Sequence, residues 1–449
     1  MTLARRLGAF DAAAIIISNV IGGGILFTPP QVAANVPRAW WFLATWVAGG
    51  ALACAGAMAY AELATVRPRA GGEYVYLDAA FGRLTAFLSG WTSFVAGFSG
   101  AIAASATVFA FYLSRFVPAA SRHSSIVAVA LIAAMAWVHI RGLGPGRAVG
   151  NVLATLKVTA LVLFVVLGIA IGRGSVTNFQ ATTGPVHATT WLLALVPVMF
   201  TYTGWNAATY VAEEIRDPSR NLPLALALGT AVVIGIYVLL NALYLYVLPI
   251  DGLAAVKGSV LDVIADRLLG ARAGDIMGVV SLISLAASIS AMTIAGPRVY
   301  YAMARDRVFF APAATLHARY HTPAISIAAQ AAWSSVLVVS GSADALIRYT
   351  GFAVVLFSGV AVAALFVLRA RDRIARPFTT WGYPVTPAVF AGAMFAIVVN
   401  AVYRDPVPSG AGILIIAAGI PVYGLFALRA RSARAINDRA TPTPAVDRS

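Results

Sequence analysis

Long apolar runs separated by short polar stretches dominate this sequence. A bilayer core about 30 Å thick needs about 20 apolar residues per helix, and charged residues or Pro and Gly bound each run. The pattern predicts an all-α polytopic membrane protein with 12 transmembrane helices. We place them at about 10–35, 39–65, 83–113, 124–140, 150–172, 187–213, 222–249, 273–304, 323–340, 344–368, 384–403 and 409–429.

Composition excludes several classes of protein. The chain is 60% hydrophobic and 11% charged, whereas soluble domains are about 25% charged. A soluble enzyme, a disordered protein and a secreted disulfide scaffold are therefore excluded. The single cysteine, Cys54, lies in an apolar run, so no disulfide-linked partner subunit is evident. The five histidines show no ligand spacing, so we expect no metal and no cofactor.

The net charge of +15 follows membrane orientation rather than nucleic-acid binding. Arginine supplies 30 of the 32 basic residues, and most lie between apolar runs. With the N-terminus in the cytoplasm, they divide 22 to 8 in favour of the cytoplasmic side. We therefore expect both termini to be cytoplasmic, no nucleic-acid partner and a multi-pass protein of the inner (plasma) membrane. No signal-peptide cleavage site follows the first run.

Two predicted helices carry helix-breaking residues in mid-span. Helix 1 contains Gly22-Gly23-Gly24, and each glycine weakens a helix by about 1 kcal/mol relative to alanine. Helix 6 contains Pro197 and Gly204 around polar side chains. Close helix packing would also explain isolated glycines. However, the two helices are five apart, as two inverted five-helix repeats require, and paired breaks of this kind indicate a midplane site in a secondary transporter.

Unwound turns offer main-chain groups that suit an amino acid. We expect a carboxylate at the N–H groups of Gly23, Gly24 and Ile25, and an ammonium at carbonyls near Val20, Ile21, Phe200 and Thr201. Neither break contains an acidic residue or an arginine, so a small or apolar neutral substrate is favoured. The predicted substrate-binding residues are Ile21, Gly22, Gly23, Gly24, Ile25, Phe200, Thr201, Tyr202, Thr203 and Gly204.

Several motifs resemble those of amino acid–polyamine–organocation permeases, and of their L-type amino acid transporter branch in particular. Together they extend over residues 18–384. They are Gly22-Gly23-Gly24-Ile25 with Thr28-Pro29, Tyr60-Ala61-Glu62-Leu63, Gly71-Gly72-Glu73-Tyr74, residues 200–206 continuing to Arg220-Asn221-Leu222-Pro223, Gly296-Pro297-Arg298, and Trp381-Gly382-Tyr383-Pro384.

The resemblance implies a leucine-transporter-like core of five-plus-five inverted repeats, with helices 1 and 6 unwound. Residues 1–172 would form the first repeat (helices 1–5) and 187–368 the second (helices 6–10). Residues 384–429 would form two additional helices (11–12), and 431–449 a cytoplasmic, disordered tail. The resemblance also implies sodium-independent alternating access, often by exchange, with Phe200 as an aromatic gate over the substrate.

Three positions in the breaks depart from the family pattern. Gly23 stands where many relatives carry serine, so one hydroxyl near the carboxylate is missing. Thr201 and Thr203 are larger than the alanine or glycine common there. We expect them to restrict the pocket to small side chains.

Lys157 on helix 5 lies roughly 10 Å into its span, at 1.5 Å per residue. A buried ammonium is costly and usually functional, although anchoring at the interface would also explain it. In bacterial relatives a helix-5 lysine replaces a sodium ion between helices 1 and 8, and Lys157 matches by position. Ser284 and Ser288, on one face of helix 8, are its expected oxygen partners.

Other polar residues have weaker expectations. Tyr237 on helix 7 is a possible gate or coupling residue near the first break, with core packing as the alternative. Glu62 and Glu73 flank a loop that contains Arg67 and Arg69, so surface ion pairing is expected there.

The leading interpretation is a permease or exchanger of neutral, small L-amino acids. A proton-coupled symporter, in which Lys157 titrates, is the alternative. A membrane-embedded enzyme would need an acid–base pair or a metal cluster in the spans, and no such pattern occurs. A channel does not fit paired helix breaks.

Overall fold

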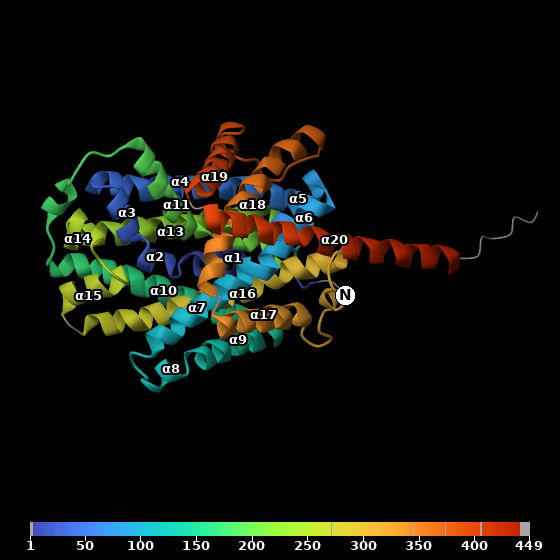
Figure 1. Ribbon diagram of the computed structural model, residues 1–449, viewed down its shortest axis with the longest axis horizontal. Coiled ribbons are helices and arrows are strands. Elements are labelled where there is room, and N and C mark those ends of the chain that lie inside the picture. Colours follow the sequence, from blue (N-terminus) through green and yellow to red (C-terminus); the bar gives the residue numbers. More distant parts are fainter. Residues whose placement is uncertain (1–2, 271, 342, 373, 405, 441–449) are drawn as a thin grey trace, which may run out of the picture.

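Helices make up nearly all of the structure. The computed structural model describes residues 3–270, 272–341, 343–372, 374–404 and 406–440. The axes of most of the long helices lie roughly along the long axis of the bundle (Figure 1). Within these residues extended pairing is limited to two isolated bridges, Leu7 with Ile215 and Arg38 with Thr182.

Nine helical segments in the described residues are long and apolar enough to cross a membrane, and three apolar helices are shorter. The all-α membrane fold is thereby confirmed, while the count of twelve spans stays a prediction. The long segments are α1–α2 (Ala9–Val20, Gly24–Phe27), α4 (Ala39–Val66), α6–η1–α7 (Arg83–Thr92, Ser93–Gly97, Phe98–Leu113), α10 (Leu143–Ile171), α13 (Pro218–Val247), α16 (Ala273–Arg305), α18 (Ala343–Arg371), α19 (Val385–Arg404) and α20 (Pro406–Ala440); the shorter helices are α9 (Ser124–Ile140), α11 (Ala188–Tyr202) and α17 (Ala324–Ser340).

Short helices connect these segments. They are α3 (Pro29–Asn35), α5 (Glu73–Phe81), α8 (Ala119–Arg122), η2 (Val176–Gln180), α12 (Ala207–Tyr210), η3 (Ala212–Glu214), α14 (Ile250–Ala254), α15 (Val260–Leu269) and η4 (Ala311–Ala314).

The interrupted helix α1–α2 lies in the centre of the bundle, where α1 packs against α10, α13 and α16 (Figure 1). Its apolar side chains, among them Ile15, Ile16 and Val20, are buried. Beside it, the rings of Trp46, Tyr202 and Tyr237 form a buried aromatic cluster with centroids 5.0–6.3 Å apart. Rigid aromatic packing of this kind fixes α4, α11 and α13 around the first break.

The two ends of the bundle differ. We call the end that holds the N-terminus and α5 the N-terminal face, and the end that holds α3, α14 and α15 the distal face (Figure 1). At the N-terminal face the main chain of Leu7 bonds to that of Glu214 and Arg216, at 3.0 and 2.9 Å. The start of the chain is thus joined to the segment that follows α12.

The last helix differs from the sequence expectation. A disordered tail is expected from residue 431, but α20 continues to Ala440. Alanine and arginine, which dominate this stretch, are strong helix formers, and this propensity explains the extension. Residues 441–449 lie outside the described part of the chain.

Candidate substrate site

The two predicted breaks lie against each other. α1 ends at Val20 and α2 begins at Gly24, while α11 ends at Tyr202 and α12 begins at Ala207. Gly204 has a φ of +108°, which favours glycine, and a Cβ there would lie 2.5 Å from Asn19 Nδ2. Asn19 Nδ2 donates to the Gly204 carbonyl at 3.4 Å. The second break therefore needs glycine for its backbone and for its contact with the first.

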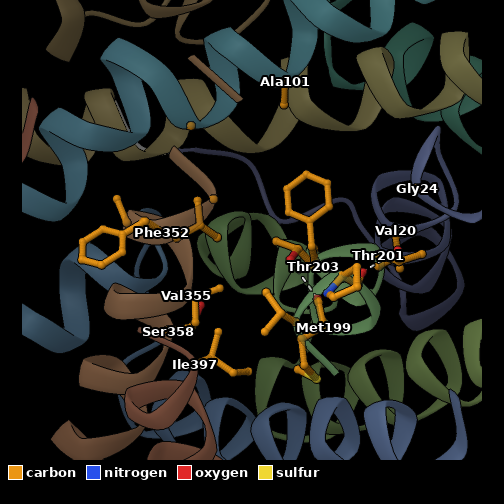
Figure 2. A pocket seen from close by; sticks show the side chains of 18 of the residues that line it. Val20, Gly24, Ala101, Met199, Thr201, Thr203, Phe352, Val355, Ser358 and Ile397 are labelled. Atoms are coloured by element: carbon orange, nitrogen blue, oxygen red, sulfur yellow. Dashed lines mark hydrogen bonds between the residues drawn. The ribbon is translucent and has the colours of Figure 1, made fainter. Parts of the chain in front are cut away.

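A cavity of about 1060 Å³ lies beside both breaks. Its lining extends from exposed Gln31 and Arg404 to buried Glu73, Asn206 and Tyr210. Figure 2 shows side chains from the two breaks, α7, α18 and α19 around this space. The cavity is therefore open toward the distal face and has its floor at the N-terminal face.

The three consecutive glycines have different surroundings. A Cβ at Gly22 would lie 3.1 Å from Ser288 Oγ, and a Cβ at Gly24 would lie 3.0–3.2 Å from Thr201. A Cβ at Gly23 would meet nothing within 4 Å. Gly24 thus allows close contact between the breaks, whereas Gly23 faces open space in the cavity.

Main-chain donors are available at the first break. Among the described residues, the N–H groups of Gly23, Gly24 and Ile25 have no hydrogen-bond acceptor. Free N–H groups at the start of a helical segment attract an anion. This geometry fits the carboxylate position expected from the sequence.

The expected ammonium acceptors are already partly used. The Ile21 carbonyl accepts from Lys157 and Ser288, and the Phe200 carbonyl accepts from the Thr203 N–H at 3.0 Å. The Tyr237 hydroxyl lies 2.9 Å from the Val20 carbonyl and 3.1 Å from the Thr201 carbonyl. Buried carbonyls of a broken helix need partners in a membrane. An ammonium would therefore have to share these acceptors.

Seven of the ten predicted substrate-binding residues line the cavity, namely Gly22, Gly23, Gly24, Phe200, Thr201, Thr203 and Gly204. The exceptions are Ile21, Ile25 and Tyr202, which are each about 1% exposed and lie in the core. At these three positions the side chain points into packing while only main-chain groups remain near the break. Sequence position alone does not distinguish these cases.

Lys157 is fully buried in α10, and its Nζ donates to the carbonyls of Ser18, at 3.2 Å, and Ile21. Ser288 Oγ reaches the same carbonyls at 2.8 and 3.3 Å. Contrary to the expectation, neither serine hydroxyl contacts Nζ among the contacts described, and Ser284 offers its carbonyl to Ser288 at 3.1 Å. Lys157 and Ser288 thus donate side by side to the same two carbonyls, at the end of α1, and not to each other.

The threonines and Phe200 contribute unequally to the cavity. Thr201 is buried, and its hydroxyl lies 2.8 Å from the Pro197 carbonyl and 3.0 Å from Thr28 Oγ1. Thr203 lines the cavity and donates to the Met199 carbonyl at 3.1 Å (Figure 2). Phe200 is 44% exposed and also lines the cavity. Thr203 rather than Thr201 is therefore placed to restrict side-chain volume.

Ion pairs between distant segments close the N-terminal face. The buried guanidinium of Arg298 holds Glu214 with two hydrogen bonds of 2.7 and 3.0 Å. The sequence predicts surface ion pairing and docking of the loop at Glu62 and Glu73. Glu62 does form ion pairs, but it is buried, and Glu73 forms none among the described residues. Four further ion pairs join distant segments here: Arg369 and Arg376 bind Glu62, Arg69 binds Asp306, and Arg67 binds Asp372.

Glu73 is the functional candidate that sequence reasoning missed. It lies on the floor of the cavity, 7% exposed, and accepts from Tyr60 at 2.6 Å and Asn206 at 2.8 Å. No ion pair involves it among the described residues. Its position in the motif Gly-Gly-Glu-Tyr, directly after two glycines, was the available signal.

Comparison with known proteins decides the family. The family model described as amino acid permease matches residues 7–426. The chain belongs to the amino acid permease family. Its family and its relatives are transporters, so the permease is a transporter rather than an enzyme. Among the described residues no group of His, Cys, Asp and Glu could hold a metal ion.

Three curated relatives illustrate the range of the family. The permease is 26% identical to a serine/threonine exchanger of Bacillus subtilis, over 94% of this chain and 96% of the relative. It is 28% identical to large neutral amino acids transporter small subunit 2 of Mus musculus, over 98% and 84%. It is 29% identical to the human cystine/glutamate transporter, over 94% and 85%. The substrates in these names differ, so kinship establishes amino acid transport without selecting the substrate.

Proposed function

We propose that the permease is a sodium-independent secondary transporter, an exchanger or permease, of neutral and small L-amino acids that works by alternating access. The observation that carries this proposal is the contact of two interrupted helices beside one cavity. Main-chain donors of one break and carbonyls of both are complementary to a zwitterion.

The zwitterion would bind along the first break. Its carboxylate would accept from the N–H groups of Gly23, Gly24 and Ile25, which have no other acceptor among the described residues. Its ammonium would share the carbonyls of Val20 and Thr201 with the Tyr237 hydroxyl. A carbonyl oxygen has two lone pairs, so it can accept from both.

Small side chains are favoured by Thr203, which lines the cavity beside Phe200. The serine/threonine exchanger among the relatives supports the same size class. Phe200 would close over the bound substrate from the distal side. The uncharged breaks supply no partner for a charged side chain in this position.

Lys157 would take the place of a coupling sodium ion. Its ammonium bonds to two carbonyls of the first break, and Ser288 on α16 bonds to the same pair. A tethered cation at this point ties α10 to α1 next to α16. Transport would then need no sodium, since the position is already filled.

The membrane would be the inner (plasma) membrane. The arginine distribution supports an orientation in which the N-terminal face and both termini lie in the cytoplasm. The cavity would then face outward in this conformation. Residues 1–172 and 187–368 would be the inverted repeats that exchange access, with helices 11 and 12 (384–429) added outside them.

A second candidate function is proton-coupled symport, in which Lys157 releases and rebinds a proton. Its support is the complete burial of an ammonium that has no carboxylate partner among the described residues. An imposed pH gradient that drives accumulation without internal substrate would favour this candidate.

The test of the proposal is uptake by purified protein in proteoliposomes. We expect alanine and serine to enter faster than arginine, glutamate or tryptophan, with equal rates in sodium and choline buffers. Empty liposomes and liposomes with the Gly24→Val variant serve as controls. Uptake of arginine or glutamate far above that of alanine and serine would refute the substrate assignment.

A further inference from the structure

A buried carboxyl group closes the cavity at the N-terminal face. Glu73 begins α5 after Gly71 and Gly72, which have φ values of +118° and +54°. A Cβ at Gly72 would lie 2.5 Å from the Tyr210 ring, and the Gly71 N–H bonds to the Tyr210 carbonyl at 3.0 Å. Only glycine permits this close turn, which presses the start of α5 against α12 and directs Glu73 to the cavity floor.

Three elements donate to a single oxygen of Glu73. Tyr60 of α4 lies 2.6 Å from Oε1, Asn206 of the second break 2.8 Å, and Ser358 of α18 3.5 Å. Among the described residues nothing donates to Oε2, although Glu73 lines the cavity. Oε1 thus joins α4, the second break and α18, while Oε2 keeps its capacity to bind a proton.

Within the part of the chain that the structure describes, no cation forms an ion pair with this carboxyl group. The titratable side chains that face it are tyrosines, Tyr60 of α4, Tyr76 of α5 and Tyr210 of α12, which are neutral at physiological pH.

Charged groups on the other neighbouring helices have their own partners. On α16, Arg298 binds Glu214, and on α18, Arg369 binds Glu62. At the start of α6, the positive charge of Arg83 opposes the burial that raises the pKa of Asp78. Burial without a cation raises the pKa of Glu73 from 4.5 to about 7.

We propose that Glu73 is a proton-binding site on the cavity floor and that its proton stabilises the conformation closed at the N-terminal face. A proton from cavity water adds to Oε2 and leaves water or hydroxide behind, while Oε1 keeps its three donors. This inference rests on the alternating access proposed above.

The direction of the effect follows from hydration. Opening the N-terminal face separates Asn206 from Glu73 and admits water, so the pKa of Glu73 falls back toward 4.5. The closed form then binds the proton more tightly than the open form, and acid favours the closed form. With pKa values of about 7 and 4.5, the closed-to-open ratio falls about thirtyfold between pH 5.5 and pH 8.5.

The experiment measures which face is open, without any substrate. Ala101, which lines the cavity on α7 (Figure 2), is changed to cysteine in a Cys54→Ser background. A membrane-impermeant methanethiosulfonate reagent labels this position from the distal side in proteoliposomes. Each labelling rate is divided by that of the same protein with Glu73→Gln, which mimics the protonated group and removes the pH dependence of the thiol itself.

We expect this ratio to be close to one at pH 5.5 and to fall, by up to thirtyfold, at pH 8.5. Tyr60→Phe removes one donor to Oε1 and should move the midpoint of the fall to higher pH. Glu213→Gln changes a carboxylate of the N-terminal face that is paired with Arg305, and should leave the profile unchanged.

Equal labelling ratios at the two pH values would overturn the proposal. So would an unmoved midpoint in Tyr60→Phe, or a loss of the pH dependence of labelling in Glu213→Gln. Such results leave the transport proposal intact, because labelling needs no amino acid. Conversely, a wrong substrate panel would not change the labelling profile.

Discussion

The contact between Lys157 and the first break provides the sharpest mutational test. Lys157→Ala removes two hydrogen bonds from an ammonium, to the carbonyls of Ser18 and Ile21. Each bond to a charged group is worth about 1.5–3 kcal/mol, and the desolvation of the ammonium offsets part of the sum. Ser288 continues to donate to both carbonyls. We therefore expect a net loss of about 1.5–3 kcal/mol for the conformation seen here, which is a ten- to hundredfold change in the balance of conformations.

Two serine variants calibrate this value. Ser288→Ala removes a neutral hydroxyl from the same carbonyls, which is worth about 0.5–1.5 kcal/mol or a two- to tenfold change. Ser284 contributes only its main-chain carbonyl, so Ser284→Ala should leave the balance unchanged. Lys157→Arg should fail like Lys157→Ala, because a planar guanidinium does not fit the compact position of an ammonium.

The assay is the apparent substrate affinity at each face of oriented proteoliposomes, in sodium and in choline buffers. In Lys157→Ala we expect the ratio of the apparent affinities at the two faces to change by tenfold or more from its wild-type value. The change should be smaller in Ser288→Ala and absent in Ser284→Ala. Sodium should not stimulate the wild type. If Lys157→Ala and Lys157→Arg both transport with unchanged affinity on each face, the lysine is only an anchor and the tethered-cation argument is wrong.

Three further changes test the cavity. Gly24→Val should abolish uptake while the protein still inserts, since its Cβ would lie 3.0–3.2 Å from Thr201, whereas Gly23→Ala, which meets nothing within 4 Å, should fold normally and weaken apparent affinity only severalfold; unfolding temperature and uptake of the matched pair separate the two effects, and equal uptake by both variants would contradict this assignment. Phe200→Ala should lower transport more than substrate occupancy, because the ring is 44% exposed in the cavity and acts as a gate; a loss of unfolding free energy near the 3–5 kcal/mol of a core truncation would instead indicate packing. Thr203→Gly should widen acceptance toward larger side chains in competition assays, and an unchanged substrate profile would remove Thr203 from the pocket.

Features encoded by local sequence were predictable. The run Gly22-Gly23-Gly24 has low helix propensity wherever it lies, and α1 ends and α2 begins around it. Gly204 marks the second break in the same way, whereas Pro197 lies inside the continuous helix α11. Lys157 could be placed in depth because a helix rises by a constant 1.5 Å per residue. The family motifs then supplied the order of the helices.

Features that depend on long-range packing were not predictable. Glu73 reaches the cavity only because the turn at Gly71 and Gly72 folds back against Tyr210, and hydropathy assigns such a residue to a surface loop. Likewise, Glu62 pairs with Arg369, which is 307 positions away in the chain. No local pattern encodes which distant helix packs beside α4, so the sequence predicts ion pairing at this loop without the partner.

In the proposed mechanism a small neutral amino acid passes, without sodium, through a site that opens to one face at a time. The most direct measurement is uptake of labelled serine into proteoliposomes that contain either buffer or unlabelled serine, at equal pH on both sides and with choline as the only external cation. Alternating access through this site predicts that internal serine accelerates the uptake several-fold and that sodium adds nothing. Uptake that ignores internal serine, and instead requires sodium or an inward pH gradient, would contradict it.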